Sequence, residues 1–185
     1  MKKIFKISFF VFSFLALFYS NAFAFLEFKQ EKDISSDTVA VRGINFNPDG
    51  TIMYITNRKT DTDGGDEDGE KGEVTQYSLS VPFDISTAIK SFTTQLVGDG
   101  GSVPQIRLAH AIEFKPDGTR MFVGERNTGR IREYILTTPF DLTSGVSLGS
   151  LSADLRGDDD DMRNIQFHSD GTILYMAGNN ATKPL

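Results

Sequence analysis

The sequence predicts an all-β fold assembled from repeated four-stranded antiparallel units. Three observations support this prediction. A sixteen-residue segment recurs three times, each copy carries Asp-Gly between two runs typical of strands, and a second segment recurs after the first two copies. The three copies are Arg42–Asn57, His110–Glu125 and Arg163–Gly178. Helical repeats would need apolar residues spaced by about 3.6 positions, and the chain shows no such spacing.

Each copy begins with a predicted strand, a tight turn and a second strand. In the first copy, Ile44 and Phe46 alternate with polar neighbours, which is the periodicity of a half-buried strand. Asn47–Gly50 is a tight turn, because proline presets φ, aspartate bonds its own backbone and glycine adopts the conformation that other residues avoid. The run Ile52–Ile55 is β-branched and aromatic and predicts an antiparallel second strand.

The second recurring segment supplies a third strand and the turn into a fourth. Its copies are Val74–Asp84 and Ile131–Asp141, and both end in Pro-Phe-Asp. Val74–Leu79 and Ile131–Leu136 are the predicted third strands. The four strands together form one antiparallel unit.

The size of this unit predicts a β-propeller. The turn glycines Gly50, Gly118 and Gly171 lie 68 and 53 residues apart, and a propeller blade takes about 40–50 residues plus its loops. We expect a propeller domain over residues 25–185, with blade repeats that start near 40, 108 and 161 and about two and a half blades in this chain. A ring usually has four to eight blades. Three alternatives stay open: the chain is a fragment of a longer product, it closes a ring by oligomerising, or it is a short open array.

The first copy also resembles a known family. Phe-Asn-Pro-Asp-Gly-Thr-Ile-Met-Tyr-Ile-Thr-Asn over Phe46–Asn57, followed by a loop and Val-x-x-Tyr, is similar to the YVTN and lactonase-like bacterial propellers of the WD40-like superfamily. The Pro-Asp-Gly turn is also shared with TolB-type propellers. Because the chain contains no tryptophan, the WD40 subtype proper is disfavoured. The resemblance implies the fold, and its lactonase-like members imply hydrolysis as one possible activity.

The first 24 residues predict export. Lys2, Lys3 and Lys6 precede the apolar run Ile7–Phe18, and Ala22–Ala24 places small residues at the two positions that a signal peptidase reads. We expect a signal peptide over residues 1–24 and a periplasmic or secreted mature chain with no membrane span after cleavage. An uncleaved anchor is the alternative, although the apolar run is short for a span of about 20 residues.

Charge and cysteine content exclude several classes of function. The chain has a net charge of −6, and without the three lysines of residues 1–24 it becomes −9. We expect no nucleic-acid partner, because binding phosphate polyanions needs a basic surface. The absence of cysteine excludes disulfides, thiolate nucleophiles and cysteine-ligated zinc.

One repeated position is a candidate ligand-binding site. Arg42, His110 and Arg163 each lie eight residues before their turn glycine, at the start of the innermost strand. In a propeller this position points toward the mouth of the central channel, on the face that carries the irregular loops. Cationic side chains there suit a carboxylate, a phosphate or a lactone oxygen. The alternative is that they pair with nearby acids, namely Asp37, Asp99 and Asp158–Asp161.

An acidic loop is a candidate metal site. Asp61, Asp63, Asp66 and Asp68 lie in a short segment that also contains glycines, a composition that suits a hard cation such as Ca²⁺. The spacing does not fit an EF-hand, and comparison of the repeats marks the loop as an 11-residue insertion. The alternative is a solvated insertion without a metal. No other cofactor is expected.

The sequence contains no convincing catalytic motif. Gly145–Gly149 matches Gly-x-Ser-x-Gly, but that motif needs a strand, a sharp turn and a helix, and no helix is expected here. The leading hypothesis is a binding module for a small molecule, a glycan or a protein. The alternative is a lactonase-like or other hydrolytic propeller, with or without a metal, that uses carboxylates and His110. A third hypothesis is a structural part of an envelope assembly.

Overall fold

A computed structural model describes the strands and most of their connections. The described residues are 29–38, 40–59, 71–96, 106, 108–126, 129–155, 157 and 161–179. All of the described strands belong to one compact unit, Glu31–Leu185. The expected signal peptide lies outside the described residues. Within these residues, no helix has the length and apolar character needed to cross a membrane.

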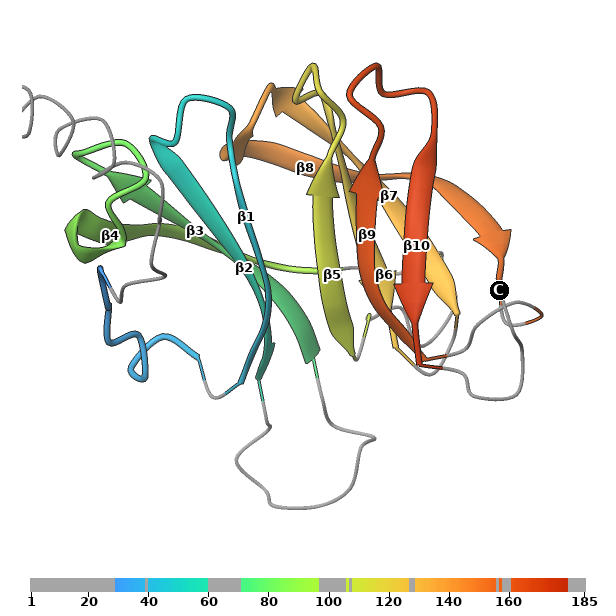
Figure 1. Ribbon diagram of the computed structural model, residues 1–185, viewed down its shortest axis with the longest axis horizontal. Helices are drawn as coiled ribbons and strands as arrows, with labels where there is room; N and C mark the ends of the chain where they lie inside the picture. The colour runs from blue at the N-terminus through green and yellow to red at the C-terminus, as the bar shows by residue number, and fades with distance from the viewer. Residues whose placement is uncertain are drawn as a thin grey trace, which may run out of the picture. The chain divides into compact units, whose positions relative to one another are not determined.

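The strands form two four-stranded sheets and one two-stranded sheet (Figure 1). In every sheet, strands that follow one another in the chain are antiparallel neighbours. The first sheet contains β1 (Val41–Phe46), β2 (Ile52–Lys59), β3 (Lys71–Leu79) and β4 (Ala88–Gln95), with a short 3₁₀-helix η2 (Ile85–Thr87) before β4.

The second sheet repeats this order, and the third contains its first half. The second sheet contains β5 (Ala109–Phe114), β6 (Arg120–Glu125), β7 (Arg130–Thr138) and β8 (Asp141–Asp154), and the third contains β9 (Met162–Phe167) and β10 (Leu174–Gly178). Each four-stranded sheet has the strand order of one propeller blade. The prediction of an all-β fold with about two and a half antiparallel blades is therefore confirmed.

The Asp-Gly turns have the backbone that their sequence predicts. Gly50, Gly118 and Gly171 have φ values of 72°, 70° and 70°, the left-handed region that favours glycine. In the first turn the Asp49 carboxylate accepts a hydrogen bond of 2.9 Å from the Thr51 backbone N–H. The local sequence thus determines the turn between the first two strands of each blade.

The phenylalanine of Pro-Phe-Asp joins the two hairpin turns of a blade. The Phe83 N–H donates to the Gly50 carbonyl, and the Phe140 N–H donates to the Gly118 carbonyl, both at 2.9 Å. Each ring covers its glycine so closely that a Cβ on Gly50 would lie 2.4 Å from the Phe83 ring. Glycine is therefore required at this position for space as well as for its φ value. The two turns lie together on one face of the blade.

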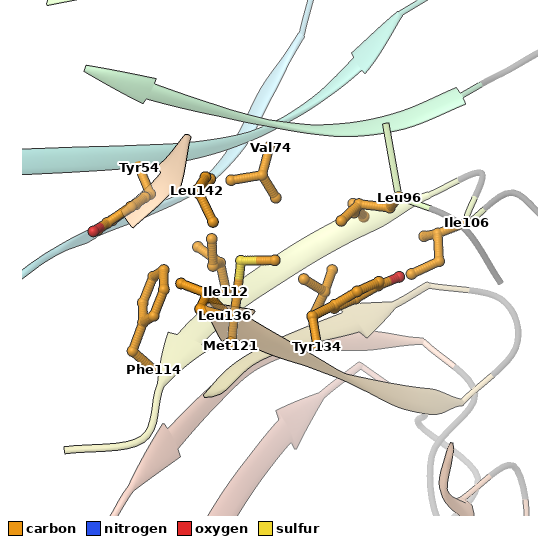
Figure 2. Packing of buried hydrophobic residues seen from close by; sticks show 12 residues of the cluster. Tyr54, Val74, Leu96, Ile106, Ile112, Phe114, Met121, Tyr134, Leu136 and Leu142 are labelled. Carbon is orange, nitrogen blue, oxygen red and sulfur yellow. The ribbon is translucent and has the colours of Figure 1, made fainter. Parts of the chain in front are cut away.

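The main core lies between the first and second sheets (Figure 2). Tyr54 packs on Phe114 with ring centroids 4.4 Å apart, and Phe122 and Phe167 repeat this contact between the second and third sheets at 5.0 Å. Burying one such side chain contributes about 1.5–3 kcal/mol. The same pair of strand positions thus joins successive blades.

Candidate functional site

The first strands of the three sheets lie next to one another, with β5 between β1 and β9. Thr56 ties β1 to β5, because its hydroxyl accepts from the Gly43 N–H at 2.7 Å and donates to the His110 carbonyl at 3.1 Å. Gly43 has no side chain where this carbonyl passes, and a Cβ there would lie 2.5 Å from the carbonyl oxygen. The beginning of β5 is therefore held against β1 through the Thr56 hydroxyl and the close approach of the His110 carbonyl to Gly43.

The three candidate ligand-binding residues occupy a β-bulge in each blade. In every first strand, the residues on either side of this position pair with consecutive residues of the second strand. This register leaves Arg42, His110 and Arg163 without partners in the ladder. A bulge disrupts the ladder and redirects the side chain of the extra residue. The repeated position is thus distinguished by its backbone as well as by its sequence.

His110 is the buried member of this set. Its side chain is 6% exposed, and its Nε2 atom has no hydrogen-bond partner among the residues that the structure describes. Burial first, and then the charges of Arg42, Arg163 and Arg126, lower the pKa of His110 from 6.5 to about 4, against an opposing effect of Asp161. At neutral pH the imidazole is therefore uncharged and surrounded by cations.

Asp161 connects two of these cations. Its carboxylate accepts a hydrogen bond of 2.7 Å from Arg126 Nε and one of 2.6 Å from Arg163 Nη2. Burial raises the pKa of Asp161, but the two arginines outweigh burial and lower it overall. Arg42 is exposed and forms no ion pair with the described part of the chain. Among the described residues, three guanidinium groups against one carboxylate give this cluster a positive charge within an acidic protein.

The structure settles part of the choice between a ligand site and pairing with nearby acids. The pairing alternative is correct for Arg163, which binds Asp161. It is wrong for Asp37, which pairs with Lys90 at 3.5 Å and accepts from the Tyr77 hydroxyl at 3.0 Å. Asp99 and Asp158–Asp160 lie outside the described residues. Ligand binding by the three repeated residues stays a prediction.

Arg126 is a member of the cluster that the sequence interpretation missed. Its N–H donates to the Leu108 carbonyl at 3.0 Å, which holds it beside the beginning of β5. A signal was present, because arginine lies eight residues after the turn glycine in two copies, at Arg58 and at Arg126. The third copy has Asn179 at this position, so the three copies do not agree there.

The structure does not describe the candidate metal loop, but it does describe the serine motif. Asp61, Asp63, Asp66 and Asp68 lie outside the described residues, and within the described ones no cluster of three His, Cys, Asp or Glu side chains is placed to hold a metal ion. Gly145–Gly149 lies inside β8, where Ser147 is an exposed residue paired with Ile135. This strand has no turn into a helix, so the motif is not a nucleophile elbow.

The arrangement is suited to binding an anion. A neutral imidazole can donate one hydrogen bond, and in the tautomer with hydrogen on Nε2 the donor is the buried atom without a partner. Arginine side chains form strong, charge-assisted hydrogen bonds with carboxylates and phosphates. A histidine with a pKa of about 4 is a poor general base at neutral pH.

Comparisons with known proteins identify no family for this chain. No family model matches it, and no curated protein matches it. A solved structure of a "putative 6-phosphogluconolactonase" from Bacteroides uniformis aligns with a TM-score of 0.43 and 14% sequence identity. The alignment covers 81% of this chain and 50% of that protein, so this chain spans half of that protein's length.

Proposed function

We propose that the protein is an exported binding module for a small anionic ligand that carries a carboxylate or a phosphate. The ligand binds where β1, β5 and β9 begin, at Arg42, His110 and Arg163. One observation carries the proposal: a buried imidazole whose Nε2 atom has no partner is surrounded by three arginines.

Energetics support an anionic ligand at this position. A buried polar atom without a hydrogen bond costs about 1–3 kcal/mol, so the free protein carries an unsatisfied group at His110. An anionic oxygen that accepts from Nε2–H removes this cost and meets the charge of the exposed Arg42. Arg126 and Arg163 add positive charge while Asp161 holds them in place.

The same residues favour binding over hydrolysis. Hydrolysis of an ester or lactone needs a nucleophile or an activated water, and a general base with a pKa near the working pH. Burial and the arginines move the pKa of His110 away from that range. From the predicted signal peptide we expect the site to lie in the periplasm or outside the cell, where a binding module would meet free solutes.

Isothermal titration calorimetry of the full chain tests the proposal. The titrants are inorganic phosphate and citrate, with Ca²⁺ in a separate titration to test the acidic loop. We expect either anion to bind the wild type, and His110→Phe and Arg42→Gln to weaken binding about tenfold each, the loss of one charge-assisted contact. Lys115→Gln is the matched control, because it removes one positive charge just after the other end of β5.

Two outcomes would contradict the proposal. One is the absence of binding by either anion. The other is equal affinity in the wild type, His110→Phe and Arg42→Gln. Turnover of a lactone or ester panel that is lost in His110→Ala would instead support the hydrolytic alternative.

A further inference from the structure

A cavity of about 280 Å³ lies at the opposite ends of the same three strands. One phenylalanine from each blade lines it: Phe46, Phe114 and Phe167, the last residues of β1, β5 and β9. Phe140, from the turn between β7 and β8, lines it as well. The cavity therefore presents aromatic surface from all three blades, and it is separate from the anion site at the beginning of these strands.

Hydrogen-bond donors and acceptors lie among these rings. Glu113 is half-buried and accepts a hydrogen bond of 2.5 Å from Asn45 Nδ2. An ionised carboxylate has about four acceptor positions, so Glu113 has capacity for further donors. The lining also includes Lys115, whose ammonium pairs with Asp117 at 3.1 Å and has further hydrogens to donate, and Ser169, whose hydroxyl donates and accepts.

We propose that this cavity binds a neutral ring compound with several hydroxyl groups, such as one hexose unit. Hydroxyl groups can donate to Glu113 and accept from Lys115, while the carbon face of the ring packs on the phenylalanines. The lining favours a neutral ligand, because the charges of the Glu113 carboxylate and the Lys115 ammonium offset each other and give no net attraction to an ion of either sign. Pockets for drug-sized ligands hold about 300–1,000 Å³, so a cavity just below this range suits a single sugar ring.

The pKa of Glu113 is consistent with this environment. Burial raises it, and the hydrogen bonds from Asn45 and from the Phe167 backbone N–H oppose the increase. The carboxyl group thus lies in a partly apolar site, where a hydrogen bond to a ligand is stronger than it is in water.

Saturation-transfer NMR of the full chain with D-glucose, D-galactose and N-acetyl-D-glucosamine tests the inference. We expect transfer to at least one of these sugars. Ser169→Trp should abolish it, because Ser169 is an exposed residue at the cavity and a tryptophan there fills the space. Ser80→Trp is the matched control, since Ser80 is exposed on the same face and does not line the cavity.

A second variant measures the contribution of the carboxylate. Glu113→Gln keeps the size of the side chain but loses the charge, and we expect affinity for the sugar to fall about tenfold. Both this variant and Ser169→Trp should keep the phosphate affinity of the wild type, while Arg42→Gln should keep sugar binding. The inference is overturned if none of the three sugars binds, or if a sugar binds Ser169→Trp as tightly as the wild type. Neither result bears on the anion site.

Discussion

The buried, neutral His110 makes the stability of the protein depend on pH. In the unfolded chain the imidazole has its ordinary pKa of 6.5, and in the folded protein the pKa is about 4. Between these two values the unfolded state binds more protons, so stability falls as the pH is lowered from 6.5 to 4. Each pKa unit corresponds to about 1.4 kcal/mol. His110 alone therefore removes about 3 kcal/mol of unfolding free energy between pH 7 and pH 4.

Urea unfolding at pH 7 and pH 4, followed by far-ultraviolet circular dichroism, measures this effect. His110→Gln is the matched variant, because glutamine keeps hydrogen-bonding groups and does not titrate. The other titrating groups are common to both proteins, so the difference between the two pH-dependent losses isolates His110. We expect the wild type to lose about 3 kcal/mol more than the variant. Equal losses, or a His110 pKa near 6.5 measured by NMR in the folded protein, would refute the burial of a neutral imidazole among arginines.

Three further substitutions test other parts of the structure. Gly118→Ala should lower the unfolding free energy by more than about 1 kcal/mol in urea unfolding, because φ is 70° and a Cβ there would lie 2.2 Å from the Phe140 ring. Unchanged stability would contradict the close contact between Gly118 and Phe140. Thr56→Val should cost about 1–3 kcal/mol and alter the NMR signals of His110, since it removes both hydrogen bonds of the hydroxyl; an unaltered imidazole signal would show that Thr56 does not position it. Ser147→Ala should change stability by no more than about 0.5 kcal/mol and leave any esterase activity intact, because Ser147 is an exposed strand residue. Loss of turnover in this variant would show that Ser147 takes part in hydrolysis.

Repetition allowed the blades to be predicted from sequence. Ile44 and Phe46 alternate in a strand, and the Asp-Gly turn that follows is determined by local backbone preferences. Three copies of the same pattern leave few alternatives, and the structure has two four-stranded sheets and one two-stranded sheet. Local and periodic signals were sufficient for the fold.

The candidate site was predictable only in part. The alignment of the copies identified Arg42, His110 and Arg163, but the bulge at each position depends on the register between two strands, which sequence alone does not give. The link from Arg126 to Asp161 joins residues of two different blades. Such contacts depend on how the blades pack against one another. The repeated position could therefore be identified from sequence, but the residues that contact it could not.

The phenylalanines that cover Gly50 and Gly118 have a consequence for the mechanics of their blades. Because Phe140 bonds to the backbone of Gly118 and covers it, the two hairpins of that blade cannot move apart at this end without losing both contacts. At the other end of the same blade, the ladder between β6 and β7 continues to the pair of Glu125 and Arg130. The two hairpins are therefore held together along their whole length, so a ligand at His110 would meet a preformed framework.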